Sequence, residues 1–142
     1  MCARVDLKAQ AEFIKKNKNN HKIKLYKLLT TTTDEVWNPS IFEFGSVKRV
    51  TGPYLKSYIY NPGINKSDSR QKLQIRDQTY IYKGIHCFTS KRAAKNYDDW
   101  NECTLVTIYA DIDDLICVAK EKQAVFKKVF LSKGSYNRVL RK

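Results

Sequence analysis

One segment, residues 84–97, constrains the fold of this chain more than any other. It reads Gly-Ile-His-Cys-Phe-Thr-Ser-Lys-Arg-Ala-Ala-Lys-Asn-Tyr. Ile85 and Cys87 can face one side of a short strand, while the residues between and after them face the other side. The two hydroxyl residues that follow can cap a helix that carries the paired alanines and the tyrosine. The segment therefore predicts a strand that turns directly into a helix.

Segments on both sides of this motif predict further strands. Apolar residues alternate or form short runs in residues 22–29, 42–50, 55–60, 104–109 and 124–131, and residues 73–82 predict another strand or a hairpin. We expect 42–50 and 55–60 to form a hairpin, and 104–109 to return beside the strand of the motif. Polar segments separate these strands, with a connection at 30–34, a turn at 37–40 and the most loop-like part of the chain at 61–69.

The N-terminal part predicts an amphipathic helix over residues 5–18, because Leu7, Ala11 and Ile14 recur at helical spacing. We expect a single α+β domain over residues 1–142, in which this helix, a mainly antiparallel sheet and a short packed helix at 91–97 share one core. The predicted core residues are Ile14, Leu25, Phe42, Val50, Ile75, Ile85, Ala94, Leu105, Ile108, Ile116, Val125 and Phe130.

Basic residues far outnumber acidic ones, with 27 Lys and Arg against 14 Asp and Glu, which gives a net charge of +13 in 142 residues. Such a surplus favours a phosphate-rich partner, either nucleic acid or a nucleotide. A generally basic, soluble surface is the alternative. Six lysines and no acid lie in residues 15–27. This stretch is either a phosphate-binding stripe or a solvated helix end followed by an edge strand protected by lysines.

The four cysteines and the two histidines do not form a recognisable metal or catalytic motif. The cysteines stand at positions 2, 87, 103 and 117, so no Cys-x-x-Cys pair and no zinc spacing exists. No apolar run approaches the roughly 18 residues of a membrane helix, and the N-terminus lacks the apolar region of a signal peptide. We therefore expect reduced cysteines, an intracellular location, no membrane partner and no cofactor.

An acidic window breaks the basic character between Lys95 and Lys120. Its six acids are Asp98, Asp99, Glu102, Asp111, Asp113 and Asp114. Carboxylates near a strand end can converge on Mg²⁺, but the run at 111–114 more often caps a helical turn. We expect the window to contact a basic surface, either in a homo-oligomer or on a host protein.

The candidate ligand site lies where the strand of the motif becomes a helix. Free backbone N–H groups and the helix dipole attract phosphate there, Thr89 and Ser90 add hydroxyl groups, and Lys91 and Arg92 add cations. His86 could donate to a ligand, although a satisfied core or rim histidine is the simpler interpretation. Tyrosines interleaved with basic residues supply stacking platforms for bases, or else pack in the sheet. The residues chosen on this ground are Arg76, Tyr80 and Tyr82.

Residues 83–97 resemble a pattern in uncharacterised viral and phage domains, including those attached to pentapeptide repeats in giant viruses. The shared features are Gly-Ile-His, an aromatic residue, a polar cap, and then Ala and Tyr on a helix. Residues 25–28 resemble the strand that opens such domains. The resemblance implies a small viral or phage accessory protein in the host cytoplasm or in a virion, and it supplies no catalytic residues.

A looser resemblance is to ADP-ribosyltransferase-like folds, carried by the same strand-to-helix step, by residues 105–109 and by Asp111. Such folds use a late glutamate, for which Glu102 and Glu121 are available. The first strand departs from their pattern, because lysines stand where an Arg or His is expected. The resemblance implies a transferase as an alternative to a binding protein.

These observations favour a non-enzymatic protein that binds nucleic acid or a nucleotide signal and counters host defence. A structural subunit of a virion or ribonucleoprotein, or an inhibitor docking on a nucleic-acid enzyme, is the alternative from another class.

Overall fold

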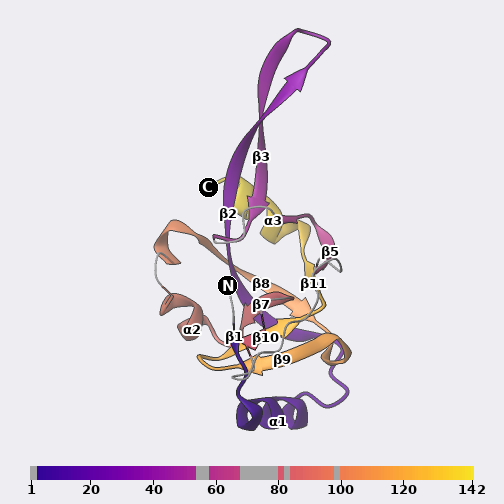
Figure 1. The fold of residues 1–142 in the computed structure, drawn as a ribbon, viewed down its shortest axis with the longest axis vertical. Helices are drawn as coiled ribbons and strands as arrows, with labels where there is room; N and C mark the ends of the chain where they lie inside the picture. Colours follow the sequence, from indigo (N-terminus) through magenta and orange to yellow (C-terminus); the bar gives the residue numbers. More distant parts are fainter. Residues whose placement is uncertain (1–2, 54–57, 68–79, 82–83, 98–99) are drawn as a thin grey trace.

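The computed structural model describes residues 3–53, 58–67, 80–81, 84–97 and 100–142, and these form an α+β domain with a nine-stranded sheet (Figure 1). The helices are α1 (Leu7–Lys16), α2 (Lys91–Lys95) and α3 (Lys133–Leu140), with short 3-10 turns η1 (Trp100–Glu102) and η2 (Ile112–Asp114). The strands are β1 (Ala3–Arg4), β2 (Ile23–Asn38), β3 (Glu43–Thr51), β4 (Ile59–Tyr60), β5 (Gly63–Lys66), β6 (Tyr80–Ile81), β7 (Ile85–Phe88), β8 (Thr104–Ala110), β9 (Leu115–Ala119), β10 (Gln123–Phe126) and β11 (Lys128–Leu131).

The strands of the main sheet follow the order β5-β11-β8-β2-β7-β10-β9, with antiparallel pairing between neighbours. Strand β3 pairs with β2 and β4 beyond this path, and β1 pairs with β6 separately. Because β2 lies between β8 and β7, the expectation that residues 104–109 lie directly beside the strand of the motif is wrong. Strand β2 is central, so the interpretation of its lysines as protection of an edge is also wrong.

A long hairpin arm formed by β2 and β3 projects away from the body of the molecule (Figure 1). Residues 30–34, expected to be a polar connection, continue β2, which pairs with β3 from Thr30 opposite Thr51 to Asn38 opposite Glu43. Threonine is β-branched and favours extended backbone even where neither face of the ribbon is buried. The expected hairpin between β3 and β4 also exists, with Val50 opposite Tyr60.

Two layers of apolar side chains lie on opposite faces of the sheet. The main core joins one face to α1, α3 and β4, and it includes Leu25, Ile108 and Phe126. On the other face, α2 covers only one part of the sheet, where Ala94 packs with Leu28 and Phe88. The remaining part of that second face is left without a covering helix among the described residues.

The motif has the predicted structure. Strand β7 leads into α2, and the Ser90 hydroxyl caps the helix by accepting a hydrogen bond from the Ala93 N–H at 3.1 Å. Gly84 enters the strand with a φ of 105°, and a Cβ atom at this position would lie 2.5 Å from a methyl carbon of Val125. Only glycine fits this backbone and this space.

Half of the predicted core is buried, namely Leu25, Val50, Ile85, Ala94, Ile108 and Val125, while Leu105 and Ile116 are partly buried and Ile75 lies outside the described residues. Three predictions are wrong. Ile14 is exposed because α1 packs through Ala9 and Phe13. Phe42 is exposed at the end of the arm, and Phe130 is exposed because its strand neighbours Val129 and Leu131 point inward.

Further corrections concern elements that the sequence did not indicate. The expected loop at 61–69 contains strand β5. The turn that leads into this strand is held by the buried Asn65 side chain, whose amide donates to the Asn61 carbonyl at 2.8 Å. The expected strand at 124–131 is two strands, β10 and β11, with different neighbours. Residues 133–142, expected to be a basic tail, contain helix α3, which the Ser132 hydroxyl caps. Strand β9 was not predicted.

Candidate nucleic-acid interface

The part of the second sheet face that no described helix covers carries a row of side chains across four strands. Phe130 of β11 is directly opposite Ile64 of β5 and Tyr109 of β8, and Tyr109 is directly opposite Lys24 of β2. Residues directly opposite each other in an antiparallel pair point to the same side of the sheet. The row is therefore set by register, and it alternates with the buried residues of the main core.

Lysines surround this row. Lys66 and Lys128 are opposite each other in the next row, the Lys22 ammonium lies 4.9 Å from the Tyr109 ring centroid, and the Lys91 ammonium lies 5.9 Å from the Tyr26 ring centroid. Cations at this distance are attracted by the π-face of a tyrosine. We call this surface the basic aromatic face, and its residues are Lys22, Lys24, Tyr26, Ile64, Lys66, Lys91, Tyr109, Lys128 and Phe130.

The apolar members of the face are accessible to solvent. Ile64 is 64% exposed and Phe130 is 44% exposed, and both line a shallow groove of 150 Å³ together with Tyr109. Asp111 and Asp114 stand at the same groove, and Asp114 is 3.9 Å from the Lys128 ammonium. The basic aromatic face is therefore acidic at this end and basic in the part that lies near β2 and α2.

The side chains of the four residues predicted at the strand-to-helix turn have different surroundings. Both donors of Thr89 are used, since its N–H and its hydroxyl donate to the Lys122 carbonyl at 2.9 and 3.2 Å. The Ser90 hydroxyl oxygen accepts the capping bond from Ala93. These two residues fix the turn, and the Lys91 side chain goes to the basic aromatic face.

The Arg92 side chain borders a second hollow of 630 Å³. Its lining residues are Phe88, Ser90, Arg92, Ala93, Asn96, Tyr97, Glu121 and Lys122. Glu121 and Lys122 form the turn between β9 and β10 with φ values of 64° and 56°. Non-glycine residues seldom adopt this conformation. The hollow mixes two cations with one carboxylate, so it is less suited to a polyanion than the basic aromatic face.

The other predicted site residues lie elsewhere. His86 is partly buried, with its Nδ1 atom 3.2 Å from the Gly84 carbonyl oxygen. Tyr80 belongs to β6, which pairs with β1, while Arg76 and Tyr82 lie outside the described residues. Among the predicted site residues whose side chains the structure describes, only Lys91 thus belongs to the basic aromatic face. Its other members include Lys22 and Lys24, which belong to the lysine-rich stretch at 15–27.

Lys27 points to the opposite side from Lys24 and Tyr26. Its ammonium donates to the His86 carbonyl at 2.7 Å and lies 5.6 Å from the ring centroid of the buried Tyr60. Burial lowers the pKa of Lys27, and burial raises the pKa of the neighbouring Cys87 thiol to about 12. Cys87 is therefore a protonated core thiol at neutral pH rather than a nucleophile.

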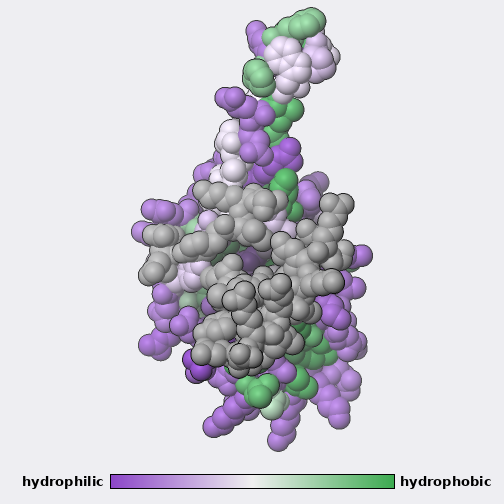
Figure 2. Space-filling view, in the orientation of Figure 1, coloured by the Kyte–Doolittle hydropathy of each residue, from purple (hydrophilic) through white to green (hydrophobic). Residues whose placement is uncertain are grey.

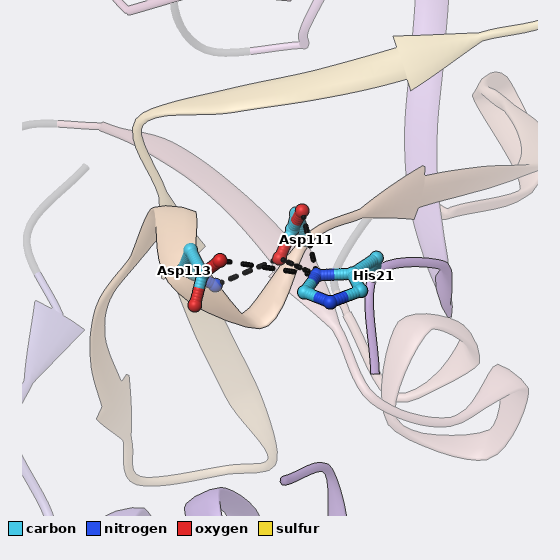
Figure 3. Close-up of side chains that lie close together, drawn as sticks. All are labelled: His21, Asp111 and Asp113. Atoms are coloured by element: carbon cyan, nitrogen blue, oxygen red, sulfur yellow. Dashed lines mark hydrogen bonds and ion pairs between the residues drawn. The ribbon is translucent and has the colours of Figure 1, made fainter. Parts of the chain in front are cut away.

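Two acids of the window, Asp111 and Asp113, form a small ionic cluster with His21 (Figure 3). The His21 Nδ1 atom lies 3.0 Å from an Asp111 carboxylate oxygen and 3.8 Å from one of Asp113. The hydrogen bond to Asp111 raises the pKa of His21, while the Asp113 N–H lowers the pKa of Asp111 by donating to its carboxylate. Asp111 caps η2, as the sequence predicted.

These three side chains present ligand atoms within 4.8 Å of one another, close enough to share a cation. When the His21 imidazole is protonated, it supplies positive charge between the carboxylates. The cluster therefore serves as an ionic link between the start of β2 and η2. Asp98 and Asp99 lie outside the described residues.

No family model, curated protein or solved structure matches this chain. The resemblance to viral and phage domains thus stays a prediction. Among the described residues, none of the helices has the length and apolar content that crossing a membrane requires.

Proposed function

We propose that this protein binds single-stranded nucleic acid on the basic aromatic face. The observation that carries the proposal is the register of β5, β11, β8 and β2, which aligns Ile64, Phe130, Tyr109 and Lys24 in one exposed row. A sheet surface that combines aromatic rings with cations can stack bases and neutralise phosphates at the same time.

The single-stranded form fits this surface better than a duplex. Bases can stack on Phe130 and Tyr109 only if they are unstacked from their own neighbours, and a paired helix presents phosphates rather than base faces to a sheet. The flanking Lys22, Lys24 and Lys66 lie where a backbone passing over the rings would place its phosphates. Repulsion by Asp111 and Asp114 directs the chain toward β2 and α2.

The proposal also includes a role in the cell, which the resemblance to viral and phage domains supports. A small basic protein that binds nucleic acid suits an accessory function in a virus or phage, including interference with a host defence that senses nucleic acid. A free nucleotide offers fewer phosphates and one base, so it occupies less of the row. We therefore expect an oligonucleotide to bind more tightly than a mononucleotide.

The test compares two double substitutions that remove the same charge. Lys24→Gln/Lys66→Gln removes two exposed cations from the face, and Lys8→Gln/Lys15→Gln removes two exposed cations from α1. Fluorescence anisotropy with a labelled oligonucleotide should show affinity reduced on the order of tenfold for the first variant. The affinity of the second variant for the oligonucleotide should be much closer to that of the wild-type protein. Equal losses in both variants would mean that net charge alone, rather than this face, attracts the ligand.

A third variant tests stacking. Phe130→Leu keeps an apolar side chain of similar size but removes the ring, and base stacking is worth about 1–3 kcal/mol per base. We expect weaker oligonucleotide binding with an unchanged dependence on salt. Unaltered affinity would contradict the use of Phe130 as a stacking platform.

A further inference from the structure

The end of the hairpin arm is an exposed apolar surface far from the main core. We call residues 34–47 the arm tip, and Figure 2 shows hydrophobic residues gathered at its end. Its exposed apolar side chains are Val36 (41% exposed), Trp37 (46%), Ile41 (58%), Phe42 (78%), Phe44 (67%) and Val47 (39%). Single exposed apolar residues are normal, but six in 14 residues mark an interaction surface.

Aromatic contacts across the ribbon order the arm tip. Trp37 is directly opposite Phe44, their ring centroids are 5.1 Å apart, and the Phe42 ring lies 6.3 Å from that of Trp37. At the base of the arm, the Lys48 ammonium donates to the Leu140 carbonyl of α3 at 2.8 Å. A preorganised aromatic cluster loses little conformational entropy on binding, which favours affinity.

The charge of the arm tip restricts the chemistry of its partner. No Lys or Arg occurs in residues 28–47, which contain three acids in a chain of net charge +13. Arg49 lies 3.0 Å from one of them, Asp34, which leaves Glu35 and Glu43 exposed without a cation in the tip. This surface repels nucleic acid and anionic lipid. It complements a protein surface that is apolar at its centre and basic around it.

The basic aromatic face has this composition. Ile64 and Phe130 are its exposed apolar centre, with Lys24, Lys66 and Lys128 around them, and Asp111 and Asp114 stand at one end of the groove that these two side chains line. The arm cannot bring its own tip to this face, because it is a paired ribbon that projects away from the body (Figure 1). We propose that the arm tip of one molecule docks on the basic aromatic face of a second copy of this chain.

This contact is a head-to-tail one, in which two different surfaces meet, so it either closes into a reciprocal dimer or continues into a chain of molecules. It stands whether or not the face also binds nucleic acid. If both occur, an oligonucleotide and the arm tip compete for the same residues, and nucleic acid dissociates the assembly.

Three variants test the contact by sedimentation velocity in the absence of nucleic acid. Phe42→Ser/Phe44→Ser removes two aromatic rings from the arm tip, and Ile64→Ser/Phe130→Ser removes the apolar centre of the basic aromatic face. As a control, Leu7→Ser/Ile14→Ser removes two exposed apolar side chains from α1. All six positions are exposed, so circular dichroism should show each variant folded. We expect the wild-type and control proteins to associate as concentration rises, and the tip and face variants to stay monomeric.

Mixing the two monomeric variants provides the decisive result. The tip variant keeps an intact face and the face variant keeps an intact tip, so the mixture can form one productive contact per pair. We expect a dimer that contains one copy of each, identified by a fluorescent label on one variant. A wild-type protein that is monomeric at all concentrations would overturn the proposal, as would association that survives in the face variant or a mixture without dimers.

Discussion

At the level of single residues, Lys27 is the side chain whose position is hardest to reconcile with stability alone. Its ammonium lies on the core side of β2, where the described residues provide a carbonyl and a tyrosine ring but no carboxylate within ion-pair distance. Burial lowers the pKa of Lys27 because water no longer solvates its charge. The sequence did not distinguish this lysine from its exposed neighbours, since strand alternation alone does not say which face is buried.

Replacing Lys27 by methionine should stabilise the protein by on the order of 1 kcal/mol, because an apolar side chain of similar length replaces a poorly solvated cation. The pKa of Lys27 is lower in the folded than in the unfolded state. The wild-type protein therefore regains this stability as pH rises through the folded pKa toward 10.5, the ordinary lysine value. The advantage of the variant should be largest near pH 7 and shrink at higher pH in urea unfolding.

Lys24→Met is the matched control for that substitution, because Lys24 is exposed on the opposite face of the same strand. It should change the free energy of unfolding by no more than about 0.5 kcal/mol. A Lys27→Met variant that is less stable than the wild-type protein at every pH would show that the ammonium contributes more through its contacts than its burial costs.

At the level of elements, the strand-to-helix motif depends on Gly84. Gly84→Ala places a Cβ atom 2.5 Å from a Val125 methyl carbon and 2.7 Å from one of Ile116, at a φ of 105°. We expect a loss of about 1–3 kcal/mol from backbone strain, with overpacking in addition. Thermal unfolding measures this loss as a lower transition temperature.

Gly134→Ala is the control for the glycine substitution. Gly134 lies in α3, and nothing lies within 4 Å of a Cβ atom added there. Alanine in a helix is more favourable than glycine by roughly 0.5–1 kcal/mol. This variant should therefore be more stable than the wild-type protein. Equal effects of the two substitutions would contradict the role assigned to Gly84.

Strands that alternate apolar side chains over the core were predictable from the sequence, and the arm was not. Residues 85–88 and 104–109 alternate apolar side chains over a core, and both are strands as expected. The arm has no such alternation, because both faces of the ribbon are exposed at residues 34–38, so the polar threonines before them read as a connection. Helix α3 was missed because glycine lowers the helix propensity of its first turn.

At the level of the whole molecule, the α+β class followed from the sequence, whereas the candidate interface did not. The basic aromatic face joins residues from β5, β11, β8 and β2 that are far apart in the chain, and only the strand order brings them together. Lys91 was chosen for a helix dipole, but its side chain lies over Tyr26 instead. The surplus of basic residues indicated a phosphate-rich ligand. The register of the strands was needed to identify the surface on which this ligand would bind.

The salt dependence of oligonucleotide binding tests the central claim most directly. The basic aromatic face presents five lysines, at positions 22, 24, 66, 91 and 128. Lys128 is paired with Asp114, so if each of the other four lysines neutralises one phosphate of a single strand, log K should fall linearly with log salt concentration, with a slope of about −3, and Lys24→Gln/Lys66→Gln should reduce the slope to about −1.5. A slope near zero, or a slope unchanged by removing these two lysines, would contradict binding of nucleic acid on this face.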